Sequence, residues 1–191
     1  MTEQTITHPE LVQALVKPGS AILASLTPTD ADLWHAATGV AGEASEIALA
    51  FRNYYEDGKL DHENLIEELG DMEFYLQQLR SNLGISREET LGKPFEGLAT
   101  SSEPLYIGIG IAIAGGDILD FIKKIVVYQK MFDRPALVKL LADFETRLSF
   151  IRAWACVDHE TVLAANIAKL SVRYAGITYS DDAAQARADK A

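Results

Sequence analysis

Apolar side chains recur every three or four residues over long stretches of the 191-residue chain, and this period limits the fold more than any other feature. Between His62 and Leu83, leucine or methionine stands at positions 65, 69, 72, 76 and 79. This spacing places the apolar side chains on one face of an α-helix, whereas a half-buried strand would alternate at every second residue. Proline, which breaks helices, occurs only six times. The sequence therefore predicts an all-α protein.

Helix-breaking and capping residues divide the chain into predicted helices. From the N-terminus we expect helices over residues 9–16, 29 or 30 to 51, 62–83, 106–131, 135–155 and 159–174. A loop is predicted over 53–61, and the glycine, proline and serine residues of 92–104 predict a linker. The tail from Ser180 is polar and rich in alanine, and we expect its Asp181-Asp182 pair to be solvated.

The formal net charge is −11, from 28 acidic and 17 basic residues. A chain this acidic repels nucleic-acid phosphates and suits a site for divalent cations, although acidity is commoner as a means of solubility. The single cysteine, Cys156, excludes an intramolecular disulfide and a multi-cysteine zinc site, and its apolar neighbours predict a buried thiol. The N-terminus lacks signal-peptide features, and the apolar run over 106–114 is too short to span a bilayer. We expect a cytoplasmic protein without nucleic-acid or membrane partners.

An internal repeat underlies the helical pattern. Identical residues recur at a spacing of 72, including the pairs Asp71/Asp143, Glu73/Glu145 and Arg80/Arg152. Upstream, a spacing of 74 places Gly42-Glu43-x-x-Glu46 over Gly116-Asp117-x-x-Asp120. Either the chain contains two copies of one helical unit, or two amphipathic helices share a leucine period.

Two pairs of carboxylates form the candidate site. Glu43 and Glu46 are three residues apart on one predicted helix, and Glu68 and Asp71 repeat that spacing on the next. Residues at i and i+3 lie on the same helix face, so an antiparallel helix pair can bring all four acids together. Oxygen ligands favour Mg²⁺, with Mn²⁺ as a substitute, over zinc. The alternative is a solvated acidic face without a metal.

These acids belong to three stretches that together resemble a known family. HAATGVAGEASEI over 35–47 and NLIEELGDM over 64–72 are similar to the E-x-x-E and E-x-x-D motifs of the MazG-like all-α NTP pyrophosphatases, a superfamily that includes dimeric dUTPases. NIAKLSVRY over 166–174 is similar to the closing N-x-x-K-L-x-x-R-Y motif of that family.

The resemblance implies a four-helix-bundle fold and Mg²⁺-dependent cleavage of an NTP or dNTP, such as dUTP, dCTP or (d)GTP, to the monophosphate and pyrophosphate. It implies that the metal ligands, which are also the catalytic residues, are Glu43, Glu46, Glu68 and Asp71. It implies that the nucleotide is contacted by Asn166, Lys169, Arg173 and Tyr174, and the tail residues Arg187 and Lys190 are weaker candidates for the same phosphates.

The chain departs from the single-copy family pattern in one respect. The closing motif follows the second copy of the repeat, and Leu140 stands where the second copy would need the counterpart of Glu68. We therefore expect a fused pseudo-dimer, in which residues 1–97 carry the complete carboxylate site and residues 98–191 form a degenerate half with the nucleotide-contact motif. The apolar run from Ile107 to Ala114 offers a further surface, which would make the assembly a homodimer of pseudo-dimers.

Two other functions were weighed. A ferritin-like di-iron protein needs Glu-x-x-His on two helices, and no glutamate stands three residues before any of the four histidines. A catalytically inactive helical module that binds nucleotides or regulates another protein remains open. Among the aromatic residues near the acids, His35 and Trp34 are expected to pack in the helical core rather than to contact substrate.

Overall fold

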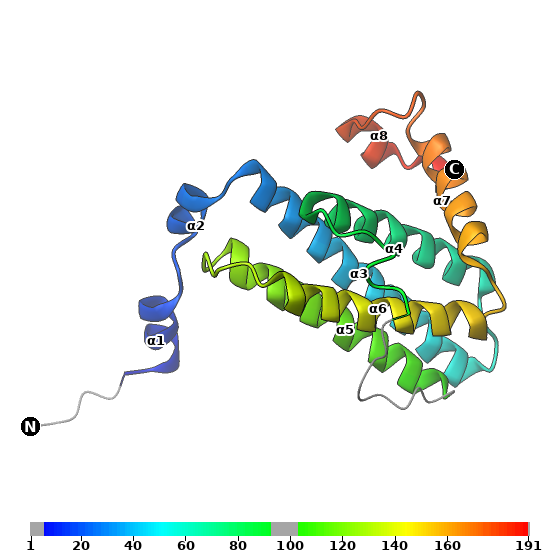
Figure 1. Cartoon of the computed structure of the whole chain (residues 1–191), viewed down its shortest axis with the longest axis horizontal. Helices are drawn as coiled ribbons and strands as arrows, with labels where there is room; N and C mark the ends of the chain where they lie inside the picture. Colours follow the sequence, from blue (N-terminus) through cyan, green and yellow to red (C-terminus); the bar gives the residue numbers. More distant parts are fainter. Residues whose placement is uncertain (1–5, 93–102, 191) are drawn as a thin grey trace, which may run out of the picture.

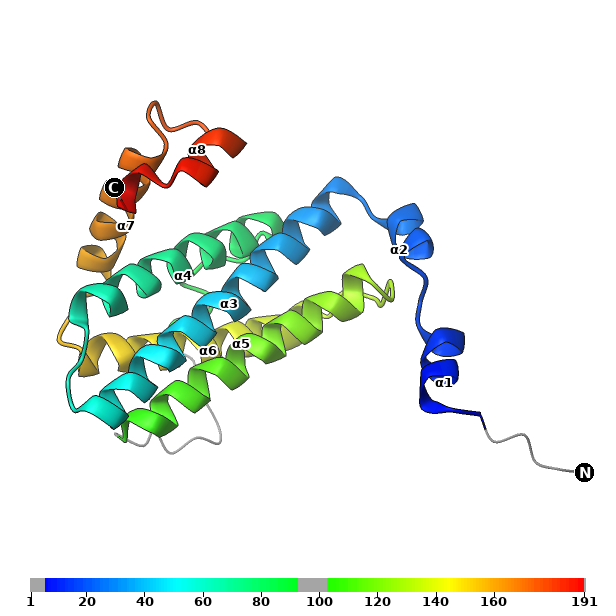
Figure 2. The ribbon, with the colours of Figure 1, turned by 180° about the vertical axis from the view of Figure 1, so that it is seen from behind.

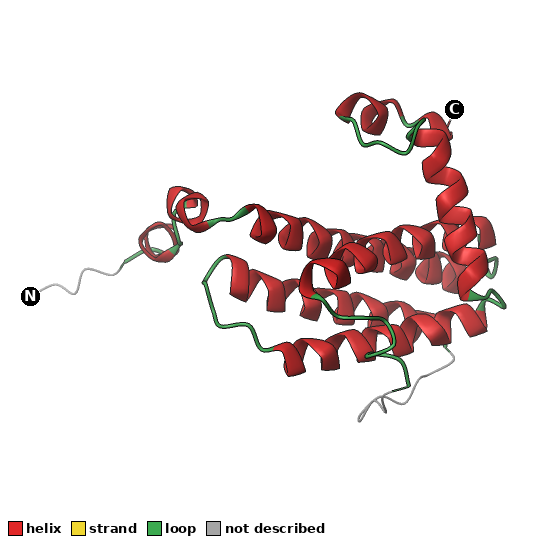
Figure 3. Ribbon diagram, turned by 45° about the horizontal axis from the view of Figure 1, so that its top comes forward, coloured by secondary structure: helices red, strands yellow, loops and turns green. Residues whose placement is uncertain are grey.

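The structure is a computed structural model that describes residues 6–92 and 103–190, and within them it contains helices and no strand (Figure 3). The prediction of an all-α fold is confirmed. The helices are α1 (His8–Leu15), α2 (Gly19–Ser25), α3 (Pro28–Asp57), α4 (His62–Leu83), α5 (Pro104–Val126), α6 (Arg134–Trp154), α7 (His159–Arg173), α8 (Asp181–Ala186) and the short 3-10 helix η1 (Ala188–Lys190).

Helices α3 to α6 form a bundle in which α3 lies between α4 and α5 (Figure 2). The helix α7 rises from one end of the bundle against α4, and α8 and η1 follow it (Figure 1). Helices α1 and α2 point away from the bundle and bury no residue. The largest fully buried side chains come from the four bundle helices and include Phe51, Leu69, Met72, Ile111, Ile118 and Phe144.

Local capping sets where α3 and α4 begin and end. Thr27 and Asp30 form a reciprocal capping box at the start of α3, and Asp61 accepts a hydrogen bond from the backbone N–H of Asn64 at 3.0 Å. Both helices end at a glycine in the left-handed conformation, Gly58 at φ 68° and Gly84 at φ 60°. These ends fix the phase of the two helices and therefore the direction in which their acids point.

Three expectations at the helix ends were wrong. The helix α3 continues to Asp57, so most of the expected loop over 53–61 is helical, and Tyr54 packs against Trp154 at 5.2 Å between ring centroids. The helix α5 ends at Val126 and not near 131, because the chain turns at Gln129, whose φ is 54°. The thiol of Cys156 is exposed, because this residue occupies the left-handed position (φ 55°) that follows α6.

The helices α3 and α5 cross closely through small residues. A Cβ on Gly115 would lie 2.7 Å from the Cβ of Ala44, and one on Gly108 would lie 3.1 Å from the carbonyl oxygen of Ala48. By length and composition alone α5 is apolar enough to cross a bilayer, but the same test is passed by core helices. Here α5 buries Ile111, Ile118 and other side chains in the core, as a core helix does.

Corresponding features recur on α4 and α6 at the spacing of 72. Asp133 caps α6 as Asp61 caps α4, and the left-handed residues after the helices are Cys156 and Gly84. Two buried ion pairs are reciprocal: Arg80 donates to Glu145 at 2.9 Å, and Arg152 donates to Glu73 at 3.0 Å. The second pair is the first pair with both residues replaced by their equivalents at a spacing of 72. A contact that repeats in this exchanged form is typical of a twofold axis. The predicted boundary between residues 97 and 98 lies outside the described residues.

Candidate functional site

Acidic side chains of α3 and α4 converge between the two helices. Glu43, Glu68 and Asp71 each place one carboxylate oxygen within 4.8 Å of the others. Glu46 lines the same cavity of about 430 Å³ beside these three acids. Glu68 is almost fully buried at 8 % exposure, whereas Glu46 is exposed to solvent. The structure thus brings together the four acids that the spacing of the sequence had paired.

The acids raise one another's pKa. Burial, followed by the charges of Asp71, Glu46 and Glu68, raises the pKa of Glu43 to about 8 from an ordinary value of 4.5. Burial, followed by the charge of Glu46, raises the pKa of Glu68 to about 7. Ionising these carboxyls together costs free energy unless a cation lies among them. Without a cation, the site keeps a proton instead. Among the described residues the cavity wall offers carboxylates and no histidine or cysteine, so its donor set fits a hard divalent cation such as Mg²⁺ better than zinc.

The helix α7 brings an amide and an ammonium group to the same acids. Asn166 Nδ2 donates to Asp71 Oδ1 at 2.9 Å, and Lys169 Nζ donates to Asp71 Oδ2 and, at 3.0 Å, to Glu67 Oε1. This approach depends on Gly70, since a Cβ there would lie 2.9 Å from the Cβ of Asn166. A carboxylate has about four lone-pair sites, so Asp71 can accept these bonds and still bind a cation.

Charged groups of α7 lie beside the acids, each in an ion pair. Burial opposes the charged form of Lys169, but the hydrogen bonds to Asp71 and Glu67 outweigh burial and raise its pKa. Arg173 lines the carboxylate cavity, and its guanidinium donates to both oxygens of Asp189 at 2.6 and 2.7 Å. The hydrogen bond from Arg173 holds the pKa of Asp189 well below its usual range.

An aromatic cavity of about 670 Å³ adjoins the carboxylate cavity and shares Tyr75, Arg173 and Tyr174 with it. The rings of His35 and Tyr75 meet edge-on, with 5.6 Å between their centroids, and the ring centroids of Tyr174 and Tyr179 are 5.9 Å apart. The Tyr75 ring lies directly over Gly39, where a Cβ would come within 2.3 Å of it. This cavity can hold a planar ring against aromatic side chains.

The two residues that were expected to pack in the helical core, Trp34 and His35, have different surroundings. Trp34 packs against the core, as expected. His35 was expected to be a packing residue, but it is exposed and lines the aromatic cavity. On α3, residues 35 and 39 are one turn apart, so the tight contact of Gly39 with Tyr75 also brings His35 next to Tyr75.

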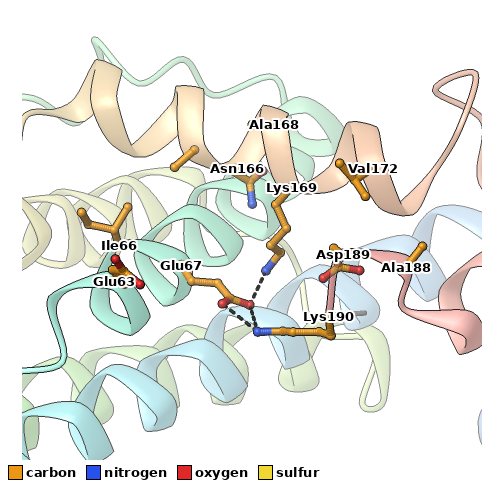
Figure 4. A pocket seen from close by; sticks show the side chains of 11 residues that line it. Glu63, Ile66, Glu67, Asn166, Ala168, Lys169, Val172, Ala188, Asp189 and Lys190 are labelled. Carbon is orange, nitrogen blue, oxygen red and sulfur yellow. Dashed lines mark hydrogen bonds and ion pairs between the residues drawn. The ribbon is translucent and has the colours of Figure 1, made fainter.

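A third cavity, of about 480 Å³, lies between α4, α7 and η1 (Figure 4). Lys169 and Lys190 both point at Glu67 in its wall. The sequence motifs did not identify Glu67 as a site residue, although it is next to Glu68. They also did not identify Tyr75, which stands one helical turn after Asp71. The return of Lys190 to the site is a tertiary contact without a local sequence signal.

The acids of the second half do not converge in this way. Asp117 is exposed, Asp120 pairs with Lys124 at 2.6 Å, and Asp143 pairs with Arg147 at 3.0 Å. Leu140 packs against the core. Over residues 6–92 and 103–190, the acids of the first half form the one group of three or more ligand-type side chains close enough to share a metal ion.

The resemblance to the MazG-like enzymes rests on the three sequence motifs and is supported only to the level of an all-α fold. Compared with models of protein families, with curated proteins and with solved structures, the chain gives no significant match.

Proposed function

We propose that this protein is a Mg²⁺-dependent nucleoside triphosphate pyrophosphohydrolase of the MazG-like type. The observation that carries the proposal is the convergence of Glu43, Glu68 and Asp71 beside the cationic face of α7. Acids with pKa values raised to about 8 and about 7 favour a cation among them. The adjoining Lys169 and Arg173 suit an anionic substrate.

In this proposal Glu43, Glu46, Glu68 and Asp71 hold the metal. A bound Mg²⁺ neutralises phosphate oxygens and lowers the pKa of an attacking water. The water oxygen attacks one of the two phosphorus atoms of the α–β anhydride, and the bond from that phosphorus to the bridging oxygen breaks. The products are the nucleoside monophosphate, pyrophosphate and a proton. A carboxylate oxygen of the cluster that is not engaged with the cation accepts that proton.

Residues of α7 position the acids and the substrate. Asn166 holds one oxygen of Asp71 by its amide and thereby orients the carboxylate. Lys169 and Arg173 offset phosphate charge, and the base lies in the aromatic cavity between Tyr75 and Tyr174. A cavity of about 670 Å³ lined by aromatic side chains has room for pyrimidines and purines, so dUTP, dCTP and (d)GTP are all candidate substrates.

The site is also proposed to be a composite of two related halves. The metal ligands come from α3 and α4 of the first half, whereas Asn166, Lys169 and Arg173 come from the last long helix of the second. The reciprocal ion pairs Arg80–Glu145 and Arg152–Glu73 support a fused pseudo-dimer. In the second half, the Arg147–Asp143 pair takes the place of a metal site.

The test is pyrophosphate release from each common NTP and dNTP, with Mg²⁺ and with EDTA. We expect Mg²⁺-dependent release from a subset of the nucleotides and a loss of about 100-fold or more in Glu68→Gln, which keeps the shape but removes the charge of the buried ligand. If no nucleotide is hydrolysed while nucleotides still bind, the chain is an inactive nucleotide-binding module and the proposed activity is wrong.

A further inference from the structure

The C-terminal segment over residues 181–190 returns to the candidate site. The chain runs from α7 through α8, and its end lies beside α7 (Figure 1). The side chain of Asp189 is only 2 % exposed, and its carboxylate accepts from Nε and Nη2 of Arg173 at 2.6 and 2.7 Å. The expectation that Asp181-Asp182 is solvated agrees with the exposure of both residues, whereas Asp189, later in the same segment, is withdrawn from solvent.

Asp189 and the substrate side of the site approach Arg173 from different directions. Asp189 belongs to the wall of the third cavity, between α7 and η1 (Figure 4), whereas Arg173 lines the carboxylate and aromatic cavities. The bidentate pair uses the Nε–Nη2 edge of the guanidinium. Because a guanidinium has five N–H donors, the Nη1 group remains for another acceptor, and its direction is fixed by the pair.

The same segment adds two cations to the carboxylate cavity. Arg187 and Lys190 both line its wall. Lys190 Nζ lies 2.7 Å from Glu67 Oε2 (Figure 4), and both residues line the carboxylate cavity as well as the third cavity. Together with Lys169 and Arg173 they make one cationic side opposite the carboxylates of α3 and α4.

Core packing does not require this arrangement. The helices α8 and η1 add no residue to the hydrophobic core, and the segment contacts α7, Glu67 of α4 and Tyr179. An ion pair near the surface, such as that of Lys190 with Glu67, contributes little to stability. The segment adds no residue to the core, yet it positions Arg173 by a bidentate ion pair and brings two cations to one cavity. Binding of an anionic ligand explains this arrangement better than a role in folding does.

We propose that residues 181–190 form a phosphate-binding wall of the site. In this wall Arg187 and Lys190 bind the triphosphate of the substrate, and Asp189 is a positioning residue that holds Arg173 toward it. The inference rests on the proposed function for the identity of the ligand, but the wall itself requires only that the ligand carry several phosphates.

The first experiment compares the full chain with a chain that ends at Ser180. The probe is inorganic tripolyphosphate with Mg²⁺, and the readout is the Kd from calorimetry. We expect the Kd to rise by about tenfold or more on truncation, because each lost charge-assisted contact is worth about one factor of ten. Binding of Mg²⁺ alone should change by less than about twofold, since its ligands are on α3 and α4. An unchanged Kd for tripolyphosphate overturns the proposal, as does a full chain that does not bind it.

Point variants separate positioning from simple charge. Arg187→Ala and Lys190→Ala should each raise the Kd about three- to tenfold, whereas Asp182→Asn, an exposed acid on α8, is the control. Asp189→Asn removes a negative charge and on charge alone would tighten anion binding. If Asp189 positions Arg173, this variant weakens binding and Asp189→Glu restores part of it. Tighter binding by Asp189→Asn would show that Asp189 competes with phosphate and would overturn its assigned role.

The proposed activity and the wall fail in different ways. A full chain that binds tripolyphosphate through residues 181–190 but hydrolyses no nucleotide disproves the activity and keeps the wall. A chain that hydrolyses nucleotides with the same KM before and after truncation at Ser180 keeps the activity and disproves the wall.

Discussion

At the scale of single residues, the sequence spacing of 74 aligns Glu43 with Asp117, but the two acids have different surroundings. Glu43 is half-buried among three other acids, whereas Asp117 is exposed on α5. We expect Glu43→Gln to lower pyrophosphate release by about 100-fold or more and to remove the rise in melting temperature that Mg²⁺ causes. The matched variant Asp117→Asn should leave both within about twofold.

The reason for this contrast is the number of acids that meet. A carboxylate alone in water binds Mg²⁺ weakly, whereas several converging carboxylates form a site. Equal losses in Glu43→Gln and Asp117→Asn, measured on proteins with the same circular dichroism spectrum, would mean that both halves hold a functional metal. The assignment of the second half as degenerate would then be wrong.

Residues of the site differ in how far the sequence could predict them. The i, i+3 spacing predicted that the acids at 43, 46, 68 and 71 would come together, because helix geometry alone aligns each pair. Nothing local marks Asp189, since its burial depends on meeting Arg173, sixteen positions earlier, on the far side of the connecting segment and the helix α8. The exposed Cys156 was missed because its apolar neighbours indicated burial, while its left-handed backbone turns the side chain outward.

At the scale of helices, the crossing of α3 and α5 depends on which glycine faces the partner. A Cβ on Gly115 would lie 2.7 Å from Ala44 Cβ, whereas a Cβ on Gly116 would meet nothing within 4 Å. Gly115→Ala should destabilise the protein by about 1–3 kcal/mol, since neither helix backbone can yield freely. Gly116→Ala should stabilise it by up to about 1 kcal/mol through helix propensity.

Urea denaturation of the two alanine variants is the measurement, and their adjacent positions make each the control of the other. Opposite signs of the change in unfolding free energy are expected. If Gly115→Ala is as stable as Gly116→Ala, then α3 and α5 do not cross as closely as the structure has them.

Helix boundaries were predictable where a cap coincides with the end of the apolar period. The prediction for α4, residues 62–83, is confirmed at both ends, because Asp61 caps its start and Gly84 its end. The end of α3 was placed six residues early, since the apolar period fades at Phe51 while the exposed last turns continue to the cap at Gly58. The helix α2 was not predicted, because it has only seven residues and none of them is buried.

At the scale of the whole molecule, the acid cluster links stability to pH. The pKa values of Glu43 and Glu68 in the folded chain are about 8 and about 7, against an ordinary 4.5. Between pH 4.5 and 8 the folded chain therefore binds more protons than the unfolded chain does. Stability falls with rising pH wherever the folded state binds more protons. Asp189 and Glu145, whose pKa values are lowered, act in the opposite direction, but only as the pH falls below about 4.5.

We accordingly expect the melting temperature in EDTA to fall between pH 5.5 and 8.5, by differential scanning calorimetry in buffers matched for ionic strength. Mg²⁺ competes with the same protons, so its stabilising effect should grow with pH and be smallest at pH 5.5. In Glu43→Gln, which cannot ionise at 43, both the slope in EDTA and the effect of Mg²⁺ should diminish. A melting temperature in EDTA that rises steadily to pH 8.5 would mean that these carboxyls are not crowded together in solution, and the metal site inferred from them would have no physical basis.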